Sequence, residues 1–381
     1  MKKVLLILAL SVFGSPVIAD HGPGRMFKAL MIPYFDLHLT KELGPPNNPY
    51  QINVDSFGLK STEEKASIKL ENFDRFFKHK FNLATIVRKN NKVVYSRFKN
   101  KAKRIPSFKG IKSNTLLHGL SMSKTALASA IGSLICSKQI ASIDDVMSKY
   151  SKSLLKTPYE DVTIRNALQM NSGVTPPGRK DVKKASAMAI GAKQYEGKAD
   201  LLKAVLLFNK KHREQGTEHN YHGADTFALS LLISDLTGKP ASQIFYENVF
   251  SKWGSTGLMH WASDKKHRTV ALSNLTMSPI NWSNFGQYII DEMKSESCFG
   301  SFFKEGLDTA VSTHRSNVKY GFQFWVYQIN NQPSITMTGH NGQFNVLNTK
   351  NNTVTIVISI DSNYSTGELF GKISEIVSEI N

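Results

Sequence analysis

A serine and a lysine at the start of an apolar stretch have the residue types and the spacing that nucleophilic catalysis requires. Ser121 and Lys124 lie three residues apart in the sequence LLHGLSMSKTALASAIGSLI, which spans residues 116–135. If a helix begins there, the hydroxyl and the amine share one face and can touch. A neutral lysine can then accept the serine proton, while the helix N-terminus stabilises a developing oxyanion. The alternative is that Ser121 caps the helix and Lys124 is a solvated surface charge.

The surroundings of this pair favour the catalytic interpretation. The pattern serine-x-x-lysine begins at five other serines, namely Ser96, Ser153, Ser263, Ser301 and Ser316. The first falls in an expected strand and the others in lysine-rich polar stretches, so we interpret all five as surface coincidences. Only the copy at Ser121 leads into a long apolar helix rich in small side chains, which predicts a buried central helix. These small residues are Ala126, Ala128, Ser129, Ala130 and Gly132.

Length and composition indicate a globular chain large enough for one compact enzyme. The 381 residues are 41% hydrophobic, and the formal net charge is +18. The basic residues are dispersed, and their densest run, RFKNKAKR at residues 97–104, matches no nucleic-acid-binding motif. We therefore expect no nucleic-acid partner. The positive charge should instead favour solubility and a weak contact with anionic envelope polymers.

The N-terminus has the features of an export signal. Residues 1–19, MKKVLLILALSVFGSPVIA, combine two lysines, a short apolar centre and small residues at its end, which predicts a cleavable signal peptide cut after Ala19. No later stretch reaches the roughly 18 apolar residues that a spanning helix needs, so no transmembrane segment is expected. The mature protein is therefore predicted to be periplasmic or secreted.

The sequence carries no complete metal or cofactor signature. Cys136 and Cys298 are its only cysteines, which excludes a cysteine-rich scaffold and a four-cysteine zinc site. Because Cys136 falls late in the apolar helix, a buried free thiol is favoured there over a disulfide, and the pairing is left open. His219 and His222 have metal-like spacing but lack a third ligand cluster. Since no phosphate loop or dinucleotide fingerprint occurs either, we expect neither a metal nor a cofactor.

Hydrophobic patterns divide the chain into two β-rich parts separated by a helical part. A helix is expected over about residues 62–78, followed by a hairpin over 83–98 with a turn at Asn90-Asn91. Residues 334–361 contain three more β-rich runs, and a last helix is expected over about 367–380. Pairing the hairpin with the late strands gives one antiparallel sheet, and a site is expected where the inserted helices meet it.

Several stretches, taken in their order and spacing, resemble the motifs of one enzyme family. They are the stretch around Ser121, VTIRNALQMNSGV at residues 162–174, NYHGADTFALSLLISDLTGK at 220–239, LSNLTMSPINWSNFGQYI at 272–289, YGFQFWV at 320–326 and TGHNGQFNVLN at 338–348. The family is that of serine β-lactamases and penicillin-binding proteins, particularly its branch of class C-like esterases and 6-aminohexanoate-oligomer hydrolases. The resemblance covers about residues 65–380.

The resemblance assigns chemical roles to particular residues. It implies Ser121 as the acylating nucleophile, Lys124 as its proton partner and Tyr221 as a second general acid/base. The alternative for Tyr221 is an amphipathic residue at a domain edge. The family's oxyanion hole uses two backbone N–H groups, which correspond here to those of Ser121 and His340. The His340 side chain either faces the substrate or is a polar residue at the rim.

The third motif departs from the β-lactamase form. That form has Lys-Thr-Gly, in which the lysine helps to hold an acidic substrate group, whereas this chain has Met337-Thr338-Gly339. The resemblance implies that Met337, Gly339 and Asn341 contact the substrate. The missing lysine argues against β-lactam or acidic-peptide recognition. Acyl transfer need not be lost, because backbone amides form the oxyanion hole.

We therefore expect three segments: the signal peptide, an irregular arm over residues 20–62, and a β-lactamase-like domain of the α/β (α+β) class over 63–381. Its antiparallel five-stranded sheet would come from residues 63–112 and 333–381, with a large helical region at 113–332. The predicted function is a serine hydrolase that cleaves small esters or short linear amides. One alternative is a β-lactamase or D-alanyl carboxypeptidase of the same fold. Another is a catalytically silent protein that binds the envelope through its basic surface.

Overall fold

The computed structural model describes residues 52–54, 71–78, 81–100, 110–174, 180–190, 198–253, 257–273, 275–340, 342–361 and 365–380. The predicted signal peptide and nearly all of the predicted arm lie outside these residues. So does Asn341, so its expected contact with substrate has no structural test.

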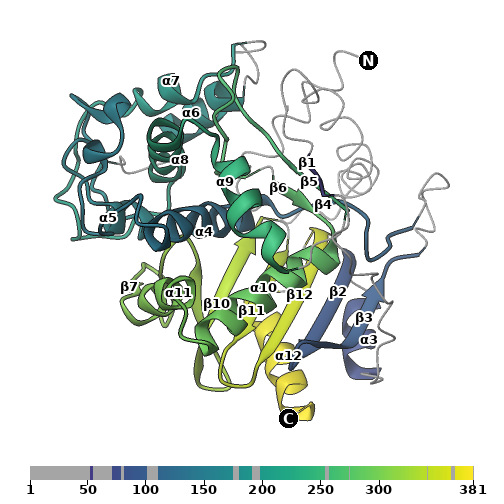
Figure 1. Ribbon diagram of the computed structural model, residues 1–381. Coiled ribbons are helices and arrows are strands. Elements are labelled where there is room, and N and C mark those ends of the chain that lie inside the picture. The colour runs from purple at the N-terminus through teal and green to yellow at the C-terminus, as the bar shows by residue number, and fades with distance from the viewer. Residues whose placement is uncertain are drawn as a thin grey trace.

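An eight-stranded antiparallel sheet forms one side of the molecule (Figure 1). Its strands, in spatial order, are β3 (Lys92–Phe98), β2 (Phe81–Lys89), β12 (Thr353–Asp361), β11 (Gln343–Asn348), β10 (Gln332–Gly339), β9 (Trp325–Ile329), β8 (Lys319–Tyr320) and β7 (Val311–Ser312). The first five are the strands that the sequence predicts. The hairpin turn at Asn90 and Asn91 is also confirmed, because both residues adopt the positive φ that a two-residue hairpin turn requires.

The predicted number of strands is wrong, because β7, β8 and β9 extend the sheet with residues that were assigned to the helical region. Strand β9 has the sequence WVYQI, and four of its five residues are buried. A strand buried on both faces lacks the alternation of polar and apolar residues that marks a half-buried strand. A second asparagine pair, Asn330-Asn331, forms the turn between β9 and β10 and also has positive φ.

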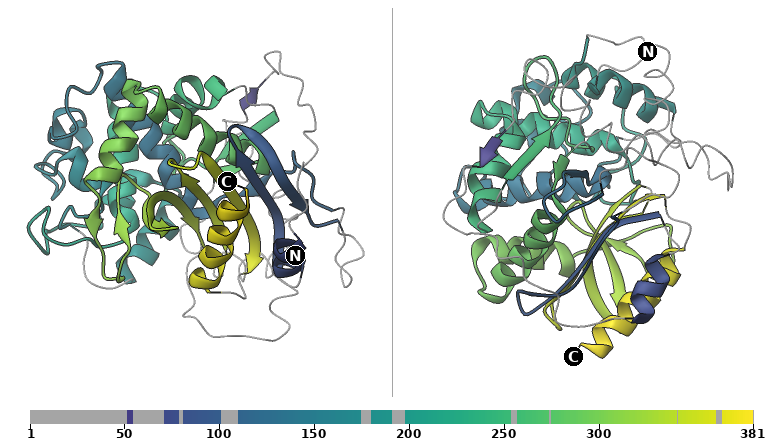
Figure 2. Two further views of the ribbon diagram at one scale, coloured as in Figure 1. Left: turned by 90° about the horizontal axis from the view of Figure 1, so that it is seen from below. Right: turned by 90° about the vertical axis from the view of Figure 1, so that its right-hand side faces the viewer.

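Helices cover both faces of the large sheet. Figure 2 shows α3 (Glu71–Lys78) and α12 (Thr366–Glu379) together on one face, whereas α10 (Pro279–Lys294) packs against β2, β11 and β12. Helix α12 begins with a capping box between Ser365 and Glu368. The last helix is thus confirmed, and the expected helix over 62–78 is confirmed for its described part.

The helix that follows Ser121 is the central element of the helical region. Helix α4 (Ser123–Cys136) is buried along nearly its whole length and packs against α8 (Gly223–Thr237), α9 (Ala241–Asn248) and α11 (Cys298–Asp308). A Cβ added at Gly132 would lie 2.8 Å from the Phe302 ring, so this glycine allows α11 to approach closely. The prediction of a buried central helix is confirmed.

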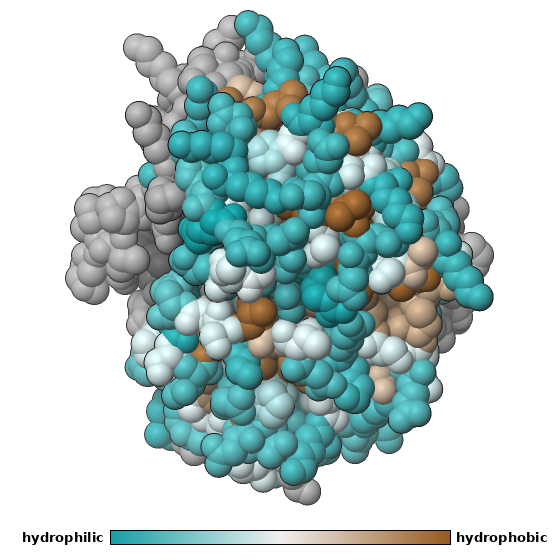
Figure 3. Space-filling view, turned by 90° about the vertical axis from the view of Figure 1, so that its left-hand side faces the viewer, coloured by the Kyte–Doolittle hydropathy of each residue, from teal (hydrophilic) through white to brown (hydrophobic). Residues whose placement is uncertain are grey.

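Further elements, most of them short, complete the helical region. They are η1 (Leu120–Met122), η2 (Met147–Lys149), η3 (Lys152–Leu154), α5 (Ile164–Leu168), α6 (Lys180–Ile190), α7 (Leu201–Val205) and η5 (Phe250–Trp253). On the face seen in Figure 3, hydrophobic residues are scattered among hydrophilic ones. Leu155 and Leu206 are among the large apolar side chains exposed at the surface. No described helix is both long and apolar enough to cross a membrane.

A small second sheet leads into the turn that carries Ser121. Its strands are ordered β1 (Ile52–Val54), β5 (Gly257–Trp261), β6 (Leu275–Met277) and β4 (Leu117–His118), and all neighbours are antiparallel. Strand β1 falls within the arm that was expected to be irregular, so this described part of the arm is a paired strand. Strand β4 ends three residues before Ser121 and fixes where the chain turns into α4.

The expectation of a free thiol at Cys136 is wrong. Cys136 and Cys298 form a disulfide, with their Cα atoms 5.7 Å apart. The bridge joins the last residue of α4 to the first residue of α11, two ends that the packing of these helices brings together. The sequence pattern could not show this, because the two cysteines are 162 residues apart.

Removing the disulfide should lower thermal stability while sparing activity. The loop-closure estimate for a bridge of this span is about 5 kcal/mol, taken as an upper bound. The bridge lies roughly 20 Å along the helix axis from Ser121, so the ester turnover that the sequence predicts should be retained at low temperature. We expect the double variant Cys136→Ser/Cys298→Ser and the reduced wild type to show the same fall in calorimetric midpoint. Equal midpoints for oxidised and reduced protein would contradict this prediction.

Candidate active site

Ser121 lies in a tight turn that two hydrogen bonds of the Ser123 hydroxyl hold in place. Leu120, the preceding residue, has a φ of 48°, a left-handed conformation that is unfavourable for leucine. The Ser123 hydroxyl stabilises the turn, since it donates to the Leu120 carbonyl at 2.6 Å and accepts from the Leu275 N–H at 3.0 Å. The turn places Ser121, which is half-buried, at the entrance to α4.

Lys124 lies one turn further along and is almost completely buried, with 1% of its surface exposed. Its Nζ lies 2.8 Å from Ser121 Oγ and donates to the Leu272 carbonyl at 2.8 Å. Burial lowers the pKa of the Lys124 amine, while its hydrogen bond and charge interaction with Tyr221 act in the opposite direction. A lowered pKa increases the neutral fraction, and the neutral amine is the form that can accept a proton from serine.

Tyr221 lies next to the lysine at the start of α8. Its side chain is 36% exposed, and the Lys124 amine lies 5.1 Å from the centre of its ring. The following residue, His222, caps α8 by accepting from the Ala224 N–H at 3.2 Å. The structure therefore brings together the three side chains to which the sequence assigns proton transfer.

The end of strand β10 lies against the turn that carries Ser121. A Cβ added at Gly339 would lie only 2.4 Å from the Gly119 carbonyl oxygen, so the two backbones approach as closely as a glycine allows. His340 follows directly and has an exposed side chain. This contact places the backbone that carries the His340 N–H beside the turn that carries the Ser121 N–H, as the expected oxyanion hole requires.

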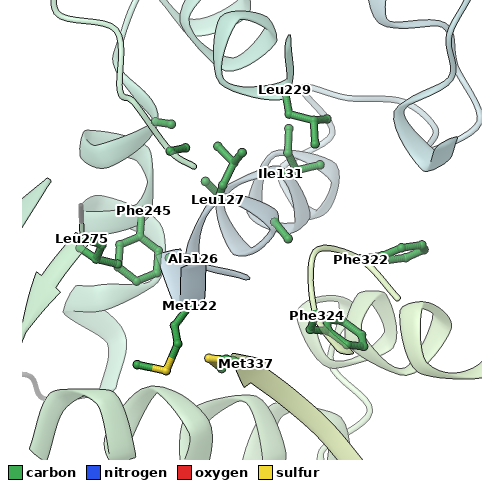
Figure 4. Packing of buried hydrophobic residues seen from close by; sticks show 14 of the residues in the cluster. Met122, Ala126, Leu127, Ile131, Leu229, Phe245, Leu275, Phe322, Phe324 and Met337 are labelled. Carbon is green, nitrogen blue, oxygen red and sulfur yellow. The ribbon is translucent and has the colours of Figure 1, made fainter. Parts of the chain in front are cut away.

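The expected contact between Met337 and the substrate is not supported, because this side chain belongs to the core. Met337 is 1% exposed, and its sulfur lies 3.6 Å from the Asn345 side-chain nitrogen. Figure 4 shows it directed toward Met122 among buried apolar residues. Successive strand residues point to opposite faces, so the half-buried Thr338 projects to the other side.

Asp225 is a neighbouring residue whose role the sequence did not reveal. It lies in the first turn of α8 and accepts hydrogen bonds from the Tyr159 hydroxyl at 2.8 Å and the Ser172 hydroxyl at 2.7 Å. Burial raises the pKa of its carboxyl to about 7. Asp225 thereby ties the segment after Tyr221 to two loops of the helical region. The only indication of this role in the sequence is that Asp225 is an acidic residue in the first turn of a largely apolar helix.

The two histidines with metal-like spacing serve different local structures. His219 Nδ1 is hydrogen-bonded to the Gln169 carbonyl at 3.0 Å, and the His222 ring caps α8. Burial is the main cause that lowers the pKa of His219 to about 4 and that of His222 to about 3. Among the described residues, no group of three or more histidine, cysteine, aspartate or glutamate side chains could hold a metal ion.

Comparison with known proteins identifies a family and a shared fold. Residues 73–288, more than half of the chain, match the family model described as Beta-lactamase. No curated protein sequence matches the chain significantly. The predicted resemblance and fold class are confirmed, apart from the number of strands.

Three solved structures illustrate how far the fold is shared. A Bacillus anthracis protein described as a 6-aminohexanoate-dimer hydrolase is 18% identical, with a TM-score of 0.67 over 88% of this chain and 89% of that one. A penicillin-binding protein from Bacillus halodurans is 16% identical, with a TM-score of 0.62 over 81% and 100%. A family VIII carboxylesterase is 14% identical, with a TM-score of 0.62 over 80% and 95%. At these identities the likeness establishes the fold alone.

Proposed function

The chain belongs to the β-lactamase family and is a serine hydrolase, and we propose that it cleaves small esters or short linear amides through an acyl-enzyme on Ser121. The observation that carries the proposal is the 2.8 Å contact between Ser121 Oγ and a buried lysine amine. An exposed lysine would be protonated near neutral pH and could not act as a base. Burial lowers the pKa of Lys124 and so increases the fraction of its amine that is neutral and can accept the proton.

The proposed acylation step uses the three side chains in sequence. The neutral Lys124 amine takes the Ser121 proton as Oγ forms a bond to the acyl carbon, and the backbone N–H groups of Ser121 and His340 stabilise the oxyanion. Collapse of this intermediate breaks the bond to the leaving oxygen or nitrogen. Tyr221 supplies a proton to the leaving atom and regains one from the Lys124 ammonium. Water then cleaves the acyl-enzyme by the reverse sequence of proton transfers.

The preference for esters and linear amides rests on the third motif. The methionine at the position of the β-lactamase lysine is a core residue, so β10 presents no cation to the substrate at that point. Faster turnover of a chromogenic cephalosporin than of any acyl ester would favour the alternative of a β-lactamase or D-alanyl carboxypeptidase. Salt-sensitive binding to anionic glycans or lipids without any acyl adduct would favour a silent envelope-binding protein.

We also propose that the protein is exported to the periplasm or secreted. The N-terminal sequence supports this location, and so does the disulfide, because such bridges persist mainly in oxidising compartments. Detection of the mature chain beginning at Asp20 in an extracytoplasmic fraction would test it. A chain that keeps residues 1–19 and stays in the cytoplasm would contradict it.

Covalent labelling tests the proposed nucleophile. A fluorophosphonate should add one adduct per chain, and peptide mass spectrometry should place it on Ser121, because only an activated serine attacks this reagent readily. The Ser121→Ala variant should remain unlabelled. A matched control is Ser153→Ala, which removes the serine of another serine-x-x-lysine copy and should label like the wild type. Labelling elsewhere, or none at all, rejects Ser121 as nucleophile.

A further inference from the structure

Arg315 is held at a defined place near the candidate site although its side chain is exposed. It lies in the turn between β7 and β8, with its guanidinium carbon 4.7 Å from the centre of the Trp325 ring. Its Nη1 donates to the Tyr327 hydroxyl at 3.2 Å. The turn is fixed as well, because the Arg315 N–H donates to the Thr313 hydroxyl at 3.1 Å. These contacts restrict where the guanidinium can lie.

A single aromatic ring separates this guanidinium from the proposed acid/base. The Trp325 ring centre lies 5.0 Å from that of Tyr221, and Tyr320 packs against both rings. On its other side, the Tyr221 ring lies 5.1 Å from the Lys124 amine. One continuous series of contacts therefore leads to Ser121, through Arg315, Trp325, Tyr221 and Lys124.

The charge of Arg315 is not neutralised within the described part of the protein. No aspartate or glutamate there forms an ion pair with it, whereas Arg165, Arg213 and Arg268 each contact a carboxylate. A guanidinium has five N–H donors in a planar fork that fits a carboxylate. The described contacts of Arg315 use one of them, the bond to Tyr327.

We propose that Arg315 binds a carboxylate on the half of the substrate that leaves during acylation. This inference rests on the proposed function, since it assumes that Tyr221 supplies the proton to the leaving atom. That atom must then depart next to the phenol, and Arg315 lies one ring beyond it. The substrate class is esters or amides whose alcohol or amine half carries an acid group. The carboxylate itself is unchanged in the reaction and serves to orient the leaving group.

Two matched substrates test this assignment. They are 4-acetoxybenzoate, whose leaving group carries a carboxylate, and its neutral methyl ester. The measured quantity is the ratio of kcat/KM for the anionic substrate to that for the neutral one. Arg315→Gln should lower this ratio about tenfold, as expected for loss of a charge-assisted hydrogen bond. Arg315→Lys keeps the positive charge but loses the planar fork of N–H donors, so its ratio should lie between those of the wild type and Arg315→Gln.

Lys319→Gln provides the control, because it removes another exposed cation from the neighbouring strand β8. Its ratio of kcat/KM values should match that of the wild type. If the Arg315 charge acted only by general electrostatic attraction, Lys319→Gln and Arg315→Gln would lower this ratio alike, and that result would overturn the proposal. Equal losses for both substrates in Arg315→Gln would also overturn it, because Arg315 would then only support Trp325. If Arg315→Gln does not fold, the ratio for Arg315→Lys is compared with that of the wild type instead, and an unchanged ratio overturns the proposal. A wild type that turns over neither ester and forms no Ser121 adduct refutes the proposed function itself.

Discussion

Replacing Lys124 with methionine should lower kcat/KM for a nitrophenyl ester by about a thousandfold or more. Methionine fills a similar volume but cannot accept the Ser121 proton, and a positioned general base contributes roughly 10²–10⁴ to rate. The effect should be strongest at high pH, where the wild-type amine is neutral. Stopped assays across pH should show the wild-type rate rising through the lowered pKa of Lys124, and this limb should be missing in the variant.

The same substitution should leave thermal stability unchanged or raise it. Burial lowers the pKa of the native amine, so the unfolded chain, with a value near 10.5, binds this proton more tightly. Wild-type stability therefore rises with pH between the native and unfolded pKa values. The advantage of the methionine variant should accordingly shrink over that window. A lower midpoint for Lys124→Met at neutral pH would indicate a structural role.

The matched control for this variant is Lys149→Met. Lys149 also lies in the helical region, but half of its side chain is exposed, and its partner is Asp145. It has no contact with Ser121, so both turnover and its pH dependence should be retained. A similar loss of activity in both variants would show that removing a positive charge, rather than the base itself, causes the effect.

The parts of the fold that follow from local sequence were predictable. Asn90-Asn91 between two β-rich runs determines a hairpin because few residues tolerate positive φ. The small side chains after Lys124 predict a helix that others can approach closely, as Phe302 does at Gly132. The pairing of Ser121 with Lys124 followed from helical spacing together with that burial.

The remaining features depend on contacts between distant segments. The Leu272 carbonyl that binds Lys124 is a backbone group, which no residue pattern can reveal. Met337 becomes a core residue because β10 has another strand on each side and helices cover the sheet. The disulfide requires α4 and α11 to be neighbours. Strand β9 was missed because burial on both faces removes the alternation that identifies a strand.

Replacing Gly339 with alanine should reduce kcat by about 10²- to 10³-fold with little change in KM. The added Cβ would lie 2.4 Å from the Gly119 carbonyl oxygen, a backbone atom that no rotamer change can move. Either β10 or the Ser121 turn must shift, and the two N–H groups of the proposed oxyanion hole then separate. Loss of an oxyanion contact weakens binding of the transition state rather than of the substrate, so the effect falls on kcat.

Gly371→Ala is the control, because an added Cβ there meets no atom within 4 Å. Gly371 is an exposed residue of α12, so alanine should keep full activity and stabilise the helix by about 1 kcal/mol or less. Circular dichroism must show that Gly339→Ala is folded before its kinetics are compared. A folded Gly339→Ala enzyme with wild-type kcat would mean that the close approach of β10 to the Ser121 turn has no part in stabilising the oxyanion.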